Sequence, residues 1–402
     1  MQLFSRARMW RRHTLKDRYD VVIIGAGVHG LATAYYLAKN GMRDVALLDA
    51  GYLGGGASGR NTAIVRANYR TAEGIAFYDE SLKLYEGMSQ ELGFNVLLSQ
   101  QGHMTLGHTD AAMKGLRERA ATNVLLGVES RIIDTNEIGR LVPELNLSQE
   151  VRYPIQGALF HPRGGIIRHD AVVWGYARAV DRQDIEIHPH TTVTGIRVTN
   201  GRVAAVETDK GTVRTGTVVN CTAGWCSNIA RMVGVDLPVT THPLQACVTE
   251  RLKPFLDKVI VSSSLHVYIN QTDRGEIIIG EEITPYTSYS SRSTLRFLEN
   301  AAAHTLELFP SLHNVRMLRQ WSGICDMTPD YSPIMGEVPQ VKGFIVDVGW
   351  GTYGFKAAPV SGKRIAELIV TGKMPDLIKP FSINRFYEGR LVGEKAAAAV
   401  SH

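Results

Sequence analysis

The segment YDVVIIGAGVHG, residues 19–30, decides the fold of this chain. Residues 20–24 predict a buried strand, because the last four, VVII, are apolar and β-branched. Three glycines follow, at Gly25, Gly27 and Gly30, and the next residues, LATAYYLAKN, have the apolar spacing of a helix. This order of strand, glycine turn and helix is typical of a dinucleotide-binding unit, in which a diphosphate lies at the helix N-terminus.

Each glycine of the turn has its own physical task. Gly25 permits the tight turn, Gly27 lets the backbone approach a pyrophosphate, and Gly30 lets the helix pack closely on the strand. A second predicted strand, residues 44–48, ends at Asp49, whose carboxylate can accept a hydrogen bond from a ribose hydroxyl. We therefore predict an ADP-containing dinucleotide here. The structural alternative is a glycine-rich turn without a ligand.

The composition is that of an ordinary globular protein, because 44% of the 402 residues are hydrophobic and 21% are charged. The net charge of +5 is concentrated in residues 1–18, which hold one acid, Asp17, and six cations: Arg6, Arg8, Arg11, Arg12, Lys16 and Arg18. The rest of the chain is neutral, so we expect no nucleic-acid-binding face. Docking of this basic tail onto an acidic partner stays open.

The tail lacks an apolar core of the length that a secretory signal needs. The one long apolar run is the glycine-interrupted dinucleotide unit, so we expect a cytoplasmic protein that does not use a membrane. The four cysteines, Cys221, Cys226, Cys247 and Cys325, form no CxxC pair and have no histidines at metal spacing. We predict buried, reduced thiols and no metal site.

The order of the remaining patterns predicts two kinds of sheet. Helices are expected at residues 75–92, 111–122, from 134 or 135 to 141, from about 170, at 293–308, and at 359–370 with Pro359 in the first turn. Short strands are expected at 193–198, 203–207, 213–219 and 344–348. From Pro238 the pattern changes to antiparallel hairpins, which indicates a separate substrate domain.

Two features stand out between these elements. The loop after Asp49 is followed by Arg60, Arg66 and Arg70, which could bind a phosphate or a carboxylate, although each alone is more typical of a surface salt bridge. His169 lies just before a helix, where a histidine is ordinarily a cap or a satisfied core residue.

Several motifs together carry a family resemblance. GAGVHGLATAYYLA, VVNCTAGW, TPDYSPIMG and GWGTYGFK resemble the FAD-dependent amine oxidases of the D-amino-acid oxidase superfamily. More narrowly, RNTAIVRANY, PRGGIIRHDAVVWGYARA, HPLQACVTE and the C-terminal AAAAVSH resemble the β subunit of heterotetrameric sarcosine oxidase. The resemblance runs from about residue 19 to the C-terminus.

The resemblance implies an α/β chain, α+β overall, with a Rossmann-like FAD-binding domain and an antiparallel-sheet substrate domain. We assign residues 19–60, 155–235 and 336–395 to a discontinuous FAD-binding domain, residues 61–154 and 236–335 to the domain that contacts substrate and partners, and residues 1–18 to the basic tail. It also implies non-covalent FAD and covalent FMN attached to His169. The cofactor-binding residues that we predict are Gly25, Gly27, Gly30, Asp49, Arg60, Asn61, Thr62, His169, Val193, Gly224, Gly351, Gly354 and Lys356.

The resemblance also implies the chemistry. Arg66 and Lys356 match positions that bind the substrate carboxylate, and Tyr268 matches a residue that lines the site; their structural alternatives are a surface ion pair, a solvated cap and a core-edge tyrosine. Ile278 takes the place of the lysine that activates oxygen in monomeric relatives, as expected if electrons leave FAD for FMN. The implied partners are a large α subunit, which carries NAD and tetrahydrofolate, and small γ and δ subunits.

The implied reaction is oxidative demethylation of sarcosine to glycine, with hydride transfer to FAD and onward transfer through FMN to oxygen. Glu281, Glu282 and Tyr353 depart from the family pattern. If the glutamates do not simply face solvent, they reshape the pocket for a larger secondary amino acid. The alternatives are therefore a dehydrogenase or oxidase for a substrate such as N-methylglutamate in a similar complex, or a non-catalytic subunit with a flavin-binding fold.

Overall fold

The computed structural model describes residues 9–394, without the side chain of Glu282. Arg6 and Arg8 of the basic tail, the last residue of the predicted range 336–395 and the AAAAVSH motif lie outside the described residues. The described part of the tail is held against the body of the protein. Arg11 pairs with Asp181 and Asp184, and Lys16 Nζ lies 2.8 Å from Glu186 Oε1.

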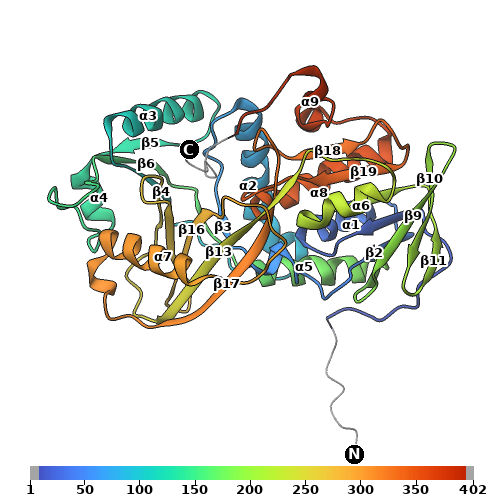
Figure 1. The fold of residues 1–402 in the computed structure, drawn as a ribbon, viewed down its shortest axis with the longest axis horizontal. Coiled ribbons are helices and arrows are strands. Elements are labelled where there is room, and N and C mark those ends of the chain that lie inside the picture. Colours follow the sequence, from blue (N-terminus) through green and yellow to red (C-terminus); the bar gives the residue numbers. More distant parts are fainter. Residues whose placement is uncertain (1–8, 395–402) are drawn as a thin grey trace, which may run out of the picture.

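A six-stranded sheet forms the right half of the molecule (Figure 1). Its strands, in spatial order, are β18 (Ile334–Glu337), β19 (Phe344–Val348), β12 (Val218–Asn220), β1 (Val21–Ile24), β2 (Val45–Leu48) and β8 (Glu186–His188). All neighbouring pairs are parallel except β18 with β19. The parallel strands are buried because both faces of the sheet are covered, and most of their residues are apolar.

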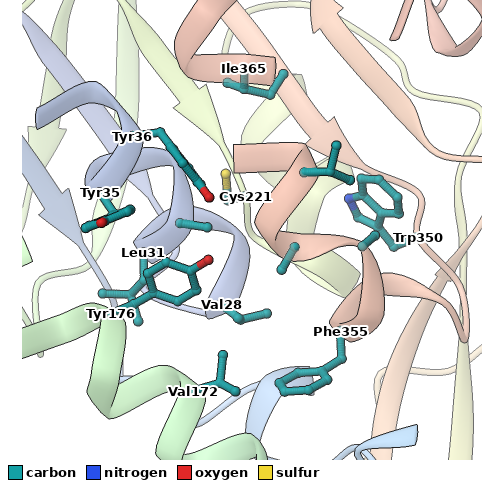
Figure 2. Close-up of a cluster of buried hydrophobic side chains, with 14 of the residues drawn as sticks. Val28, Leu31, Tyr35, Tyr36, Val172, Tyr176, Cys221, Trp350, Phe355 and Ile365 are labelled. Carbon is teal, nitrogen blue, oxygen red and sulfur yellow. The ribbon is translucent and has the colours of Figure 1, made fainter. Parts of the chain in front are cut away.

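Helices cover one face of this sheet and make the largest core. The helices are α1 (Val28–Lys39), α2 (Ala72–Leu92), α5 (His169–Arg182) and α8 (Gly354–Thr371). Figure 2 shows side chains from three of them facing one another, among them Leu31, Tyr176 and Ile365. A Cβ atom on Gly362 of α8 would lie 2.5 Å from the Ala32 carbonyl carbon of α1, so this glycine lets the two helices approach closely.

A three-stranded sheet and α6 (Cys226–Arg231) accompany the other face. The three strands are β9 (Val193–Thr199), β10 (Arg202–Thr208) and β11 (Gly211–Arg214). The single strand predicted at residues 213–219 was wrong, because Val213 belongs to β11 and Val218 to β12 of the six-stranded sheet. The polar interval TGT, residues 215–217, is where the chain passes from one sheet to the other.

An eight-stranded sheet forms the left half of the molecule (Figure 1). In spatial order it contains β17 (Met317–Met327), β13 (Thr240–Arg251), β16 (Glu276–Ile283), β15 (Val267–Gln271), β14 (Val259–Ser262), β4 (His103–Gly107), β6 (Gly157–His161) and β5 (Arg131–Ile133). Only β14 and β4 pair in parallel. The helices α3 (Asp110–Leu125), α4 (Thr135–Leu141) and α7 (Leu295–Leu308) pack against it. The predicted mixed α/β architecture is confirmed.

Small elements connect the two halves. Strands β3 (Ile64–Val65) and β7 (Gly165–Ile166) pair with each other, and α9 (Arg385–Glu388) follows the last core helix.

The predicted domain limits stay a prediction. Two elements pack against a domain other than the one to which their residues were assigned. Strand β6 lies in the eight-stranded sheet although residues 155–235 were assigned to FAD, and α2 packs on α8 although residues 61–154 were assigned to the substrate domain.

Helix α8 begins earlier than the sequence predicted. It starts at Gly354, so Pro359 lies inside the helix and not in its first turn. Proline has no N–H to donate to the carbonyl four residues earlier, that of Phe355. The Tyr85 hydroxyl of α2 donates to this carbonyl instead, and the Ser81 hydroxyl donates to the Lys356 carbonyl at 2.6 Å. Contacts with α2 therefore allow a proline that usually marks a helix start.

The four cysteines are free and buried, as predicted. Among residues 9–394, no helix has the length and the apolar character needed to cross a membrane.

Candidate active site

The glycine turn has the geometry that its sequence predicts. Gly25 has a φ of 106°, and a Cβ atom there would lie 2.5 Å from the Cys221 carbonyl oxygen. A Cβ atom on Gly30 would lie 2.0 Å from the Gly25 carbonyl oxygen, so only glycine lets α1 pack this closely on the turn. The backbone between β1 and α1 is therefore tightly folded and bare of side chains.

Asp49 lies at the end of β2, beside this turn. Its Oδ2 accepts from the Ala26 N–H at 2.8 Å, and its Oδ1 accepts from the Gly51 N–H at 2.8 Å. Burial raises the pKa of Asp49, and the two backbone donors act against that rise. Each carboxylate oxygen keeps a lone pair for another donor, such as a ribose hydroxyl.

A cavity of about 900 Å³ lies next to the turn, and residues from both large sheets form its wall. Most of the predicted site residues are wall residues: Gly25, Gly27, Asp49, Arg60, Asn61, Thr62, Arg66, Val193, Tyr268, Gly351, Gly354 and Lys356. Gly30, Gly224 and His169 are not part of the wall. Gly30 packs behind the turn, and a Cβ atom on Gly224 would lie 2.5 Å from Ile324 Cγ2, so Gly224 packs on β17.

His169 is the first residue of α5 and is partly buried. It lies between Arg168 and Asp170, whose side chains pair at 2.8 Å. Burial lowers the pKa of His169, and the neighbouring Asp170 acts against that. The lowered pKa favours the neutral form of His169, which lies outside the cavity wall, as Gly30 and Gly224 do.

Arg66 and Lys356 meet in one part of the wall. Arg66 is 3% exposed, and its guanidinium lies 4.3 Å from the Tyr69 ring centroid and donates to the Asn68 carbonyl at 2.9 Å. Burial, together with the charge of Arg66, lowers the pKa of Lys356 to about 7. The two cations therefore lie close enough to repel each other.

A third buried cation, Arg119, lies next to Arg66 but is not itself a wall residue. Arg119 of α3 is 4% exposed, and its Nε donates to the Asn68 carbonyl at 2.8 Å, the same oxygen that Arg66 uses. Burial and the charge of Arg66 lower the pKa of Arg119 to about 9. We call Arg66, Arg119 and Lys356 the cation cluster. No carboxylate of the described side chains lies within ion-pair distance of any of the three.

Two buried histidines beside the cluster add no charge. Burial, followed by the neighbouring cations, lowers the pKa of the wall residue His103 well below its ordinary value. Burial likewise lowers the pKa of His161 to about 4. The cluster is therefore a region of positive charge without a counterion, which suits a bound anion.

Tyr268 of β15 faces Gly280 of β16 across the strand pair. A Cβ atom on Gly280 would lie 2.0 Å from Tyr268 Cζ, so the glycine makes room for the ring. Burial raises the pKa of the Tyr268 hydroxyl, and the nearby Thr62 side chain acts against that rise. Ile278, two residues before Gly280, is not a wall residue.

The residues that depart from the family pattern do not all face the cavity. Glu281 is a wall residue and 8% exposed, so the expectation that it faces solvent was wrong. Its carboxylate lies 3.1 Å from His304 Nδ1 of α7. Tyr353 is 2% exposed, packs edge-on against Tyr69 and does not line the cavity.

Sequence reasoning missed a wall histidine and the buried carboxylate that pairs with it. His29, the fifth residue of GAGVHG, lines the cavity and lies 3.0 Å from Asp347 Oδ2 in β19. The signal was present in the sequence, since each residue interrupts an otherwise apolar segment. Arg119 gave no such signal, because it lies 53 positions after Arg66 in a predicted helix to which the sequence assigned no function.

The wall fits a dinucleotide such as FAD. Bare glycine backbone lies at the start of α1, where the free N–H groups of a helix attract a diphosphate. Asp49 lies close to this turn, and the buried Thr352 Oγ1 in the wall has no hydrogen-bond partner among residues 9–394. These groups can bind a large polar ligand that also has an apolar body.

Comparison with known proteins agrees with this geometry. Residues 20–368 match the family model described as DAO, FAD dependent oxidoreductase. Sarcosine oxidase subunit beta of Rhodobacter capsulatus is 43% identical over 396 residues, covering 98% of this chain and 95% of that protein. The subunit of the same name from Arthrobacter sp. is 39% identical over 395 residues, covering 98% and 97%.

A solved structure, L-proline dehydrogenase from P. horikoshii, has a TM-score of 0.88 and 27% identity, and the match covers 94% of this chain and all of that one. The glycine turn, the cavity and these similarities lead to one conclusion. The chain belongs to the DAO family of FAD-dependent oxidoreductases, as an amine oxidoreductase of the sarcosine oxidase β-subunit type.

Proposed function

We propose that this chain oxidises sarcosine to glycine, with non-covalently bound FAD as the hydride acceptor. The observation that carries the substrate class is the cation cluster, which places Arg66 and Lys356 without a counterion in the wall of the dinucleotide cavity. An unpaired buried cation is costly, so a ligand carboxylate that pairs with it is bound strongly. Sarcosine supplies one carboxylate and a secondary amine next to it.

The side chains of this protein bind and orient the substrate. Arg66 and Lys356 hold the carboxylate, while Tyr268 and Thr62 form another part of the wall. FAD, when bound, supplies the two-electron acceptor for a hydride from the N-methyl carbon of the neutral amine. Loss of that hydride leaves an iminium, which water converts into glycine and formaldehyde, or which transfers its carbon to tetrahydrofolate.

We also propose that His169 carries FMN covalently and that electrons pass from FAD through FMN to oxygen. Two features support this: the resemblance of GIIRHDAV to the family motif, and a partly buried, neutral imidazole outside the wall of the dinucleotide cavity. On the same resemblance we propose assembly with a large α subunit that binds NAD and tetrahydrofolate, and with small γ and δ subunits. The cytoplasmic location stays a prediction.

The test separates the two flavins. The purified complex is precipitated in acid, and the pellet is digested and analysed by mass spectrometry. The proposal predicts free FAD in the supernatant and a flavin mass on the peptide that contains His169. In a His169→Asn variant the FAD stays and the peptide flavin disappears, whereas a His190→Asn control keeps both. If all flavin is released from the wild type, the FMN assignment is wrong.

The substrate is tested by anaerobic mixing of the complex with sarcosine or with dimethylamine, which has no carboxylate. The proposal predicts rapid bleaching of the FAD absorbance by sarcosine alone. Equal bleaching by both amines would contradict the carboxylate-binding role, and no bleaching by sarcosine would contradict the function. Oxygen uptake during turnover distinguishes an oxidase from a dehydrogenase.

A further inference from the structure

Both ring nitrogens of His29 face acceptors. Nε2 lies 2.8 Å from the Gly354 carbonyl oxygen, and Nδ1 lies 3.0 Å from Asp347 Oδ2. A carbonyl or carboxylate oxygen only accepts, and a neutral imidazole carries only one N–H. With a neutral ring, one of the two contacts would join two lone pairs. Beside an ionised Asp347, the two contacts require the doubly protonated imidazolium.

Asp347 has the surroundings of an ionised carboxylate. It is 1% exposed, and it accepts from the Ser361 hydroxyl at 2.6 Å and from Trp350 Nε1 at 2.8 Å, besides its contact with His29. The Ser361 hydroxyl also lies 3.3 Å from His29 Nδ1, but its proton is directed to Asp347. Burial lowers the pKa of His29, while Asp347, the Gly354 carbonyl and Asp326 raise it, and the net change is upward.

The His29–Asp347 pair has a defined orientation. His29 lines the cavity, whereas Asp347 lies behind it in β19 and is not a wall residue. The positive end of the pair therefore faces the cavity. His29 is also the second residue of α1, and Gly354 is the first of α8, so this one ring joins the N-termini of two helices at the cavity wall.

The segment that His29 holds is itself part of the wall. Trp350, Gly351 and Gly354 line the cavity, and the Trp350 ring centroid lies 4.7 Å from that of His29. Figure 2 shows Trp350 beside the start of α8, the helix that carries Lys356 two residues after Gly354. Displacement of the His29 ring would therefore move the turn that leads to Lys356.

We propose that His29 is a positioning residue for the bound flavin: as a fixed imidazolium it holds the turn at residues 350–354 and presents positive charge to the cofactor. This inference rests on the proposed binding of FAD in this cavity. A fixed positive charge stabilises a flavin that has accepted two electrons more than it stabilises the oxidised flavin. His29 thus raises the reduction potential of the FAD and makes the FAD a stronger oxidant of the substrate.

The experiment measures the midpoint potential of the non-covalent FAD in the assembled complex, by equilibration with reference dyes. His29→Gln keeps one donor and removes the charge. We expect it to lower the equilibrium constant for reduction about tenfold, which is about 30 mV for a two-electron couple. The matched control is His188→Gln, because His188 also pairs with a buried carboxylate, Glu186 at 3.2 Å, but lies outside the cavity wall.

The outcomes separate the two proposals. A wild-type complex that lacks FAD or is not reduced by sarcosine overturns the proposed function. A complex that binds FAD and is reduced by sarcosine, but whose His29→Gln potential equals that of the wild type, overturns the role of His29 alone. An equal fall in the His188→Gln control would also overturn it, since the effect would then not depend on the cavity.

A second measurement uses the wild-type complex alone and reports the protonation of its histidines directly. Solid-state ¹⁵N spectra of the histidine-labelled wild-type complex at pH 8 report whether each ring nitrogen carries a proton. We expect one imidazolium that persists at this pH, with both nitrogens protonated. A spectrum in which every histidine has an unprotonated ring nitrogen would contradict the proposal.

Discussion

Two groups of buried cations lie in or beside the wall of the same cavity, and only one of them has a counterion. At the junction of α1 and α8, His29 has a counterion, Asp347, at 3.0 Å. At the other group, Arg66, Arg119 and Lys356 lie together without an ion pair to any described carboxylate. The paired cation keeps its charge, because Asp347 offsets the cost of burial. In the unpaired group burial lowers the pKa of Arg119 and Lys356.

The difference separates a structural charge from a binding charge. A buried ion pair that is fully hydrogen-bonded fixes the position of the elements that carry it. A buried cation without a partner costs stability in the free protein and recovers that cost when an anion binds. We infer that the His29–Asp347 pair sets the geometry of the site and that the cation cluster supplies the free energy of substrate binding.

The largest expected effect is the loss of Arg66. Removing one partner of a buried charge pair costs about 2–5 kcal/mol, so Arg66→Gln should lower kcat/KM for sarcosine by about two to three orders of magnitude. Steady-state kinetics with equal FAD content measures this. Arg43→Gln is the control, because Arg43 is exposed and is not a wall residue; we expect less than a threefold change. If kcat/KM of Arg66→Gln falls less than tenfold, the substrate carboxylate does not bind at Arg66.

Breaking the paired group should affect stability. Asp347→Asn leaves His29 without its counterion and should lower the free energy of unfolding by about 3 kcal/mol. Denaturant unfolding of the full chain measures this. Asp44→Asn removes a partner of Lys16 from an exposed pair at 3.4 Å and should cost less than about 1 kcal/mol. If Asp347→Asn and Asp44→Asn lower the free energy of unfolding equally, the His29–Asp347 pair has no special structural role.

The smallest expected effect on stability is that of Arg119. Arg119→Met removes hydrogen bonds to the Asn68 carbonyl but also removes repulsion from Arg66, so the free energy of unfolding should change by less than about 1 kcal/mol. The affinity for acetate should fall about threefold to tenfold, because the cavity loses positive potential. Arg119→Lys keeps the charge and should retain most of that affinity. If Arg119→Met lowers the free energy of unfolding by several kcal/mol, this arginine has a structural role and not a binding role.

The sequence predicted the parts of the fold that depend on local chemistry. The turn at Gly25 and the strand β19 were predicted correctly, because backbone sterics and continuous apolar runs leave few alternatives. Predictions were wrong where distant segments decide the structure. Pro359 was predicted in the first turn of a helix, but the Tyr85 hydroxyl of α2 donates to the Phe355 carbonyl, which allows the proline inside α8. Residues 213–219 belong to two different sheets, which the local pattern does not distinguish.

The candidate site was predictable to a similar degree. The residue pattern alone indicated the dinucleotide turn and Asp49, whereas Arg66, Lys356 and Tyr268 depended on family resemblance. The cavity wall contains Gly25 and Gly27 of the turn and also Asp49, Arg66, Tyr268 and Lys356, whereas Gly30 of the turn packs behind it. His29 and Asp347 were missed because 318 positions separate them in the chain, and no local pattern shows that one is the counterion of the other.

The most direct test of the unpaired cluster is the number of protons taken up when a carboxylate binds. With a pKa of about 7, Lys356 is mostly neutral at pH 8 in the free cavity, and a bound anion raises that pKa. Acetate affinity should therefore fall as pH rises above 7. Calorimetric titration of the FAD-containing complex with acetate at pH 8, in buffers of different ionisation enthalpy, should show uptake of about one proton per site. Lys356→Met should show none. Acetate binding to the wild type without proton uptake would contradict the account.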